Sequence, residues 1–158
     1  MSLQAGTEPG RVTSERPAGR VRALRRASFA ALVLLLIQYG LGMYTNLYVT
    51  VPAGDQGQGF GKAVSNGPAA LSVHAVLGFL LILAALGLLV QAVLARYWSV
   101  LAASAVALAA IVFAAVQGAR FVDQGGPDSA SMTMAVLAGV AMLCYGTALY
   151  LLPAPRRA

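Results

Sequence analysis

Four long apolar segments constrain this chain more than any other feature of its sequence. They cover about residues 27–51, 69–94, 99–119 and 129–152, and each is rich in leucine, alanine and valine. A helix of roughly 20 apolar residues crosses a hydrocarbon layer of about 30 Å. The segments lack the alternation of polar and apolar residues that is typical of a transmembrane β-strand. The sequence therefore predicts an all-α polytopic membrane protein, with a four-helix transmembrane domain over residues 27–152.

The composition points to the same class of protein. Charged residues make up only 10% of the chain, whereas they make up about a quarter of an ordinary soluble domain. The one cysteine, Cys144, cannot form an intrachain disulfide, a thiolate metal cluster or a CxxCH haem attachment. It is expected to pack as a buried thiol.

The net charge of +6 is explained by membrane topology, without a nucleic-acid partner. Nine of the eleven basic residues lie on one side of the segments: six arginines before the first segment, Arg96 between the second and third, and Arg156 and Arg157 after the last. Lys62 and Arg120 fall on the other side. The positive-inside rule then predicts a multi-pass protein of the cell membrane, with both termini and the Arg96 turn in the cytoplasm.

The segments outside the helices are short or polar. Residues 1–26 predict a disordered basic cytoplasmic tail, with a helical stretch next to the membrane as the alternative, and residues 153–158 predict a second tail. The GRVRALRR run in the first tail is expected to hold the first helix in place, with binding of anionic lipid headgroups as a second reading. The turn at Arg96 is only a few residues long, so the second and third helices should be antiparallel neighbours. An up-down-up-down bundle follows.

Polar side chains form one layer near the external ends of the helices. His74, the only histidine, lies about 6 Å inside the end of the second helix. Gln38 lies deeper and needs a partner across the bundle or a buried water. Gly78 follows His74 at i+4 on the same face and leaves room beside the imidazole. The other members of the layer are Tyr44, Asn46, Gln117, Ser131 and Thr133, with Arg120 just above them.

Two interpretations of this layer remain open. In the first, each polar side chain caps a helix, reaches the membrane surface or bonds a neighbouring carbonyl, as polar residues near helix ends commonly do. In the second, the layer is a site that opens toward the outside, with His74 as ligand or proton carrier.

A faint repeat leads to a family resemblance. The outer half of the first helix, IQYGLGMYTNLYV, is similar to that of the third, VQGARFVDQGG, which suggests that two helix pairs repeat. With Gln38, Gly42 and His74 in the first pair and Gln117-Gly118 in the third helix, residues 30–150 resemble one four-helix half of the heme A synthase family. The chain also resembles uncharacterised four-helix membrane proteins of actinobacterial type.

The resemblance implies a b-type haem with His74 as axial ligand. The family's histidine in the fourth helix is replaced here by SASMTMA. A second ligand would then come from Met132 or Met134, since a thioether can ligate haem iron, or from His74 of a second copy. Arg120 would face a propionate, or else pair with Asp123 or a lipid phosphate.

Two classes of function follow. All five acidic residues lie in tails or loops, so the helices lack the carboxylate that an ion-coupled transporter uses. The favoured hypothesis is a non-catalytic accessory protein that binds membrane lipids, a membrane protein or a second copy of itself. The alternative is a haem-binding redox or haem-handling protein. Its site residues would be His74, Gly78, Met132 and Arg120, next to the polar layer of Gln38, Asn46 and Gln117.

Overall fold

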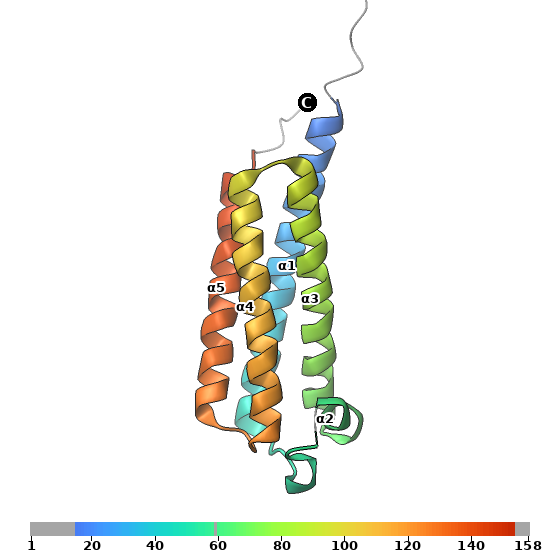
Figure 1. Cartoon of the computed structure of the whole chain (residues 1–158), viewed down its shortest axis with the longest axis vertical. Helices are drawn as coiled ribbons and strands as arrows, with labels where there is room; N and C mark the ends of the chain where they lie inside the picture. The colour runs from blue at the N-terminus through green and yellow to red at the C-terminus, as the bar shows by residue number, and fades with distance from the viewer. Residues whose placement is uncertain (1–14, 59, 154–158) are drawn as a thin grey trace, which may run out of the picture.

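The computed structural model describes residues 15–58 and 60–153, and the regular structure within them is helical (Figure 1). Four long helices form a bundle, and two short helices lie in the connection between the first two of them. The elements are α1 (Glu15–Tyr48), η1 (Ala53–Asp55), α2 (Phe60–Asn66), α3 (Ala69–Ala95), α4 (Trp98–Asp123) and α5 (Asp128–Leu151).

The four long helices are long and apolar enough to cross a membrane. Their candidate spans are Gly19–Tyr48, Ala69–Ala95, Trp98–Asp123 and Asp128–Leu151. Even the shortest, with 24 residues, is about 36 Å long at 1.5 Å per residue, which exceeds a hydrocarbon core of about 30 Å. The predicted all-α fold with four apolar helices of spanning length is confirmed.

The long helices form a ring in which neighbours are antiparallel. α1 packs against α3 and α5, and α4 packs against the same two helices, most extensively against α5. α1 and α4 therefore lie on one diagonal of the ring, and α3 and α5 on the other. α3 turns tightly into α4 because Arg96 adopts a left-handed conformation with φ of 58°. Its N–H donates to the carbonyl of Val93 over 3.0 Å and closes the helix.

The two ends of the bundle differ in chemistry. The arginine end holds the start of α1, the α3–α4 turn and the end of α5 (Figure 1). There, Nη1 of Arg20 donates to the carbonyl of Leu94 over 3.3 Å, and Nη1 of Arg25 donates to that of Leu152 over 3.0 Å. Both carbonyls end helices whose last C=O groups lack intrahelical partners. These two arginines of GRVRALRR thus tie α1 to α3 and α5. The opposite end, which carries η1, α2 and the α4–α5 turn, is the loop end.

α1 begins at Glu15 and not near Ala27, so residues 15–26 are helical where a disordered tail was expected. Leu24 is completely buried in the core, and Val21 packs against the same core. This extra stretch is held by apolar packing as well as by arginine side chains. The expected tails at residues 1–14 and 154–158 lie outside the described residues.

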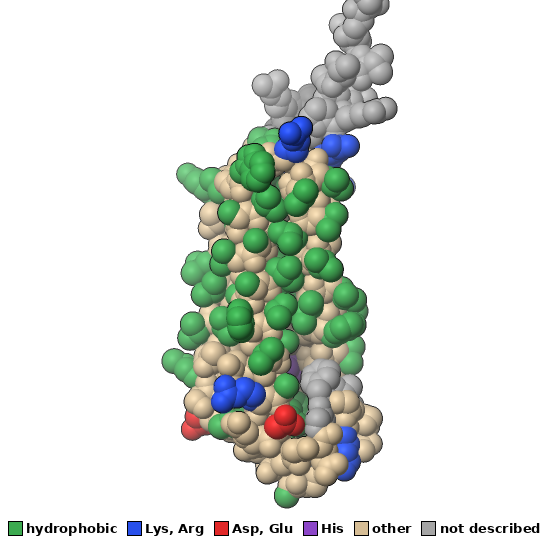
Figure 2. Space-filling model, viewed as in Figure 1, with side chains coloured by type: hydrophobic (Ala, Val, Ile, Leu, Met, Phe, Trp, Pro, Cys, Tyr) green, Lys and Arg blue, Asp and Glu red, His purple; other side chains and the backbone are tan. Residues whose placement is uncertain are grey.

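The bundle is packed with small residues inside and large ones outside. Much of the core is alanine, and Tyr145 is its largest fully buried side chain. Large apolar side chains such as Phe113 and Leu143 point outward, with 62% and 74% of their surface exposed. Figure 2 shows hydrophobic side chains over most of the height of the helices. Small residues at helix contacts and an apolar outer surface are typical of membrane bundles. Cys144 is half-buried and packs against the core.

Candidate functional site

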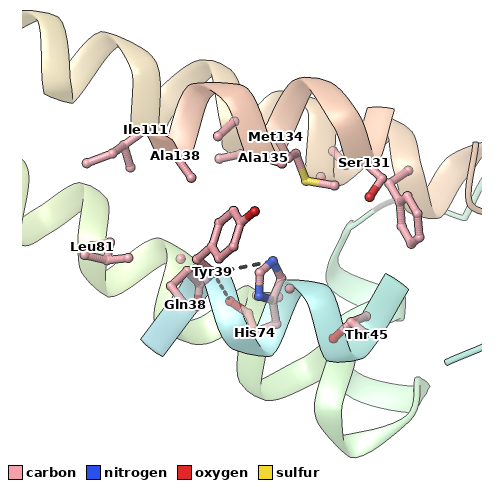
Figure 3. Close-up of a pocket in the computed structure, with 18 of the residues that line it drawn as sticks. Gln38, Tyr39, Thr45, His74, Leu81, Ile111, Ser131, Met134, Ala135 and Ala138 are labelled. Carbon is pink, nitrogen blue, oxygen red and sulfur yellow. Dashed lines mark hydrogen bonds between the residues drawn. The ribbon is translucent and has the colours of Figure 1, made fainter. Parts of the chain in front are cut away.

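A cavity of about 480 Å³ lies toward the loop end of the bundle, and all four long helices contribute to its walls (Figure 3). Its size falls within the roughly 300–1,000 Å³ of small-molecule sites. Most of its lining is apolar, as at Leu81, Ile111 and Ala138. The polar side chains among the lining residues are Gln38, Tyr39, Thr45, Asn46, His74 and Ser131.

The polar centre of the cavity is a contact between α1 and α3. Nε2 of Gln38 donates to the backbone carbonyl of His74 over 2.8 Å. The same nitrogen lies 3.5 Å from Nε2 of the His74 ring. An amide nitrogen only donates, so the imidazole Nε2 accepts in this contact and the ring proton is assigned to Nδ1. The partner that Gln38 requires is therefore His74.

Two glycines make this contact reciprocal. A Cβ at Gly42 would lie 2.9 Å from Cε1 of His74, and a Cβ at Gly78 would lie 3.1 Å from Nε2 of Gln38. His74 therefore lies over Gly42, which follows Gln38 at i+4 on α1. Gln38 in turn lies over Gly78, which follows His74 at i+4 on the antiparallel helix α3. The room that Gly78 leaves beside His74 is used by Gln38. A side chain at either glycine would push α1 and α3 apart or displace the polar group.

The Gln38–His74 pair does not satisfy all of its own hydrogen-bonding groups. Oε1 of Gln38 and Nδ1 of His74 are buried and have no partner within the described part of the chain. A buried polar atom without a partner costs about 1–3 kcal/mol. With the assigned tautomer, the pair offers one acceptor and one donor.

The predicted polar layer divides into residues that reach the cavity and residues that do not. Asn46 and Ser131 line the cavity together with Gln38 and His74. Tyr44 is exposed and lies beside Tyr48, with ring centroids 5.2 Å apart. The exposed Thr133 hydroxyl donates to the carbonyl of its own helix at Ser129.

Gln117 and Arg120 stay outside the cavity lining. Nη1 of the exposed Arg120 donates to Oε1 of Gln117 over 3.5 Å along the same helix. A role for Arg120 inside the cavity is not supported by this position. Met132 is also outside, with 68% of its surface exposed.

Met134 lines the cavity in place of Met132. Its sulfur would lie 3.4 Å from a Cβ at Gly118. Figure 3 shows the His74 ring and the Met134 thioether on opposite sides of the space, with the Tyr39 ring pointing into it as well. Tyr39 and Thr45 are lining residues absent from the predicted layer. Tyr39, Gly42 and Thr45 follow one another at i+3 along one side of α1. This spacing could have predicted from the sequence that Tyr39 and Thr45 share a face with Gly42.

The loop end of the cavity is closed by apolar side chains. Leu71, Phe121 and Val122 line the cavity, and they also belong to the loop-end cluster, a buried group completed by Val51 and Ala130. The Phe121 ring also packs beneath the α4–α5 turn at Gly126, whose φ is +89°. A site that opens toward the outside was one of the two interpretations of the polar layer. At this end of the cavity the structure has a layer of apolar packing.

The polar side chains of the cavity are neutral groups and one imidazole. Among the described residues that line it there is no carboxylate, lysine or arginine, and His74 is its one ionisable nitrogen base. Within the described residues, no group of three or more His, Cys, Asp or Glu side chains is placed to hold a metal ion. No protein-family model, curated protein or solved structure matches this chain.

Proposed function

We propose that this chain is a non-catalytic accessory protein of the membrane that binds a small, uncharged, largely apolar molecule in its cavity. The observation that carries the proposal is a cavity of about 480 Å³ whose walls come from all four long helices. The Gln38–His74 pair supplies its main polar feature. Burial of a charge without an opposite charge is costly. Because no aspartate, glutamate, lysine or arginine is among the described lining residues, an uncharged ligand is favoured.

A bulky side chain in the cavity wall is expected to abolish ligand binding. Ala138 lines the cavity, and Ala138→Phe would fill part of that space. Native mass spectrometry of protein extracted from membranes should show a bound molecule on the wild type and none on this variant. Val136→Phe is the matched control, because Val136 lies on the same helix, is 55% exposed and does not line the cavity.

Two results would contradict this proposal. One is the same bound mass on the Ala138→Phe variant as on the wild type. The other is a wild-type protein that carries no bound molecule after exchange into a whole-membrane lipid extract.

A second candidate function is haem binding, as the resemblance to the heme A synthase family implies. It is favoured by the placement of His74 on α3 and Met134 on α5, which line the same cavity from diagonally opposed helices. Histidine and methionine together are a known axial pair for haem iron. Two features fit haem less well. Gln38 lies against Nε2 of His74, and the described lining residues include no lysine or arginine that could pair with a propionate.

Visible spectroscopy tests this second candidate. If haem binds, detergent-purified protein from haem-supplemented cells should show a Soret band that His74→Ala abolishes and Met134→Leu shifts. Met132→Leu should leave the spectrum unchanged, because Met132 is exposed away from the cavity. The absence of a Soret band from the wild type would eliminate haem, and a band that survives in His74→Ala would eliminate His74 as ligand.

We also propose that the arginine end faces the cytoplasm and the loop end the exterior, in the plasma membrane. Arg22, Arg26 and Arg96 are exposed at the arginine end, in addition to the two arginines that bind carbonyls, and this asymmetry supports the orientation. Alkaline phosphatase inserted after Gln58 should be active, and alkaline phosphatase fused after Ala158 should be inactive. The reverse pattern would refute the orientation. Equal alkaline phosphatase activity at the two positions would refute the three membrane spans proposed between Gln58 and Ala158.

A further inference from the structure

The cavity reaches the side of the bundle between α3 and α4. Phe79 on α3 and Val112 and Val116 on α4 line the cavity, yet 57%, 40% and 51% of their surfaces are exposed. In Figure 2 the His74 side chain, the only purple one, is visible in a recess between these two helices. α4 packs much less against α3 than against α5. The cavity therefore has a mouth on the side of the bundle.

Apolar packing lies between the cavity and each end of the bundle. The loop-end cluster closes one end. Toward the arginine end, the core is filled by buried residues such as Leu88, Ala107 and Tyr145. The mouth, in contrast, lies on a surface of exposed apolar side chains, among them Val76 and Phe113. In a membrane, this surface faces lipid.

We propose that the gap between α3 and α4 is a lateral entrance through which a membrane-dissolved alcohol, an apolar molecule with a single hydroxyl head, enters the cavity. The inference rests on the proposed binding function and names the route and the ligand class. The apolar body occupies the space near Leu81, Ile111 and Ala138. The hydroxyl lies at the Gln38–His74 pair.

The unpaired groups of the Gln38–His74 pair select the head group. Nδ1–H of His74 is a donor, and Oε1 of Gln38 is an acceptor, and neither has a partner in the described part of the chain. A hydroxyl both donates and accepts, whereas a carbonyl only accepts. Both atoms are covered in the structure, so the proposal requires that the two side chains change rotamer to turn them toward the cavity, where one hydroxyl would serve both groups. A hydrocarbon without a head serves neither and leaves their desolvation cost in place.

Photolabelling of the full chain in lipid nanodiscs tests the route and the head group together. The probes are hexadecanol with a diazirine at mid-chain and the matched hexadecane diazirine, with labelled residues mapped by mass spectrometry. The alcohol should label cavity-lining residues at least about fivefold more than the hydrocarbon, which is the effect of one of its two hydrogen bonds at about 1 kcal/mol. Val112→Trp should reduce this labelling severalfold. Val106→Trp is the matched control, because Val106 is 52% exposed on the same helix and does not line the cavity.

Two results would overturn the inference and leave the proposed function intact. Equal labelling of the Val112→Trp and Val106→Trp variants would refute entry between α3 and α4, and would direct attention to Tyr39 and Met43, the exposed lining residues of α1. Equal labelling by the two probes would refute recognition of the hydroxyl. In both cases native mass spectrometry should still show a bound molecule on the wild type and none on Ala138→Phe. If the wild type also carries no bound molecule, the proposed function itself is refuted. The ligand could be a sterol-like alcohol or a linear alcohol. An excess of each, unlabelled, is added during photolabelling, and the one that reduces labelling by the hexadecanol probe more strongly identifies the class.

Discussion

Replacement of Gly42 by leucine is expected to lower the free energy of unfolding by about 2 kcal/mol, the middle of the range for an overpacked contact, and to abolish ligand binding. Even the first carbon of a side chain at this position would lie 2.9 Å from Cε1 of His74. The imidazole would have to leave its place over α1, and the rest of the leucine would force α1 away from α3. The hydrogen bond from Gln38 to the His74 carbonyl, now 2.8 Å long, would then be lost.

Alanine at the same position is expected to act more mildly. The atom that meets the new Cβ is the far end of a side chain, and the ring borders an open cavity into which it can turn. Gly42→Ala should therefore cost about 1 kcal/mol, the low end of the same range, and should weaken ligand binding more than it weakens the fold.

Gly40→Leu is the matched control for these two variants. Gly40 is exposed on the same helix, and a Cβ there would meet no atom within 4 Å. Unfolding in bicelles and native mass spectrometry measure both effects. A Gly42→Leu variant as stable as Gly40→Leu would show that α1 and α3 do not meet through Gly42 and His74.

The number and placement of the long helices were predictable because length and apolar composition decide them. The start of α1 was not. The polar, arginine-rich sequence before Ala27 hides Val21 and Leu24, which pack against the core. Arg20 and Arg25 also look like solvated charges in the sequence, and their bonds to the carbonyls of Leu94 and Leu152 depend on helices that are far away in the chain.

The sequence predicted how deep in the membrane the site residues lie along their helices. It did not predict which side of the helix each residue faces. The position of a residue along a helix follows from its distance to the helix end. Its direction follows from an apolar stripe in a soluble protein, and helices that are apolar on all sides have no such stripe. Met132 and Met134 are two positions apart, which is about 200° around the helix. Only the packing of α5 determines that Met134 lines the cavity and Met132 is exposed.

His74 was identified because an imidazole is unusual in a membrane helix, and Gly78 because it follows His74 at i+4 on the same helix face. Gln38, like His74, is polar within a membrane helix, and the sequence also required that it find a partner. The identity of this partner follows from the sequence spacing. Gln38 is followed by Gly42 at i+4, and His74 is followed by Gly78 at i+4. A polar residue followed by glycine at i+4 on two antiparallel helices predicts such a reciprocal contact, and this signal was present in the sequence.

Tyr145 is expected to respond in opposite directions to two substitutions. Its ring is fully buried in the core near the arginine end, so Tyr145→Ala should lower the free energy of unfolding by about 3–5 kcal/mol through loss of packing and creation of a cavity. Its hydroxyl has no hydrogen-bond partner in the described part of the chain. Tyr145→Phe removes that hydroxyl and keeps the ring, and should raise the free energy of unfolding by about 1 kcal/mol.

The control for the phenylalanine substitution is Tyr150→Phe on the same helix, where the ring is 88% exposed and no change in stability is expected. A Tyr145→Phe variant less stable than the wild type would mean that the hydroxyl is bonded after all. Ser28 and Ser104 are fully buried in the same half of the bundle, and their hydroxyls also lack a protein partner among the described residues. A buried water shared by such hydroxyls would supply that bond. In that case Ser104→Ala should cost a similar amount of stability, and the double variant with Tyr145→Phe should cost less than the sum of the two.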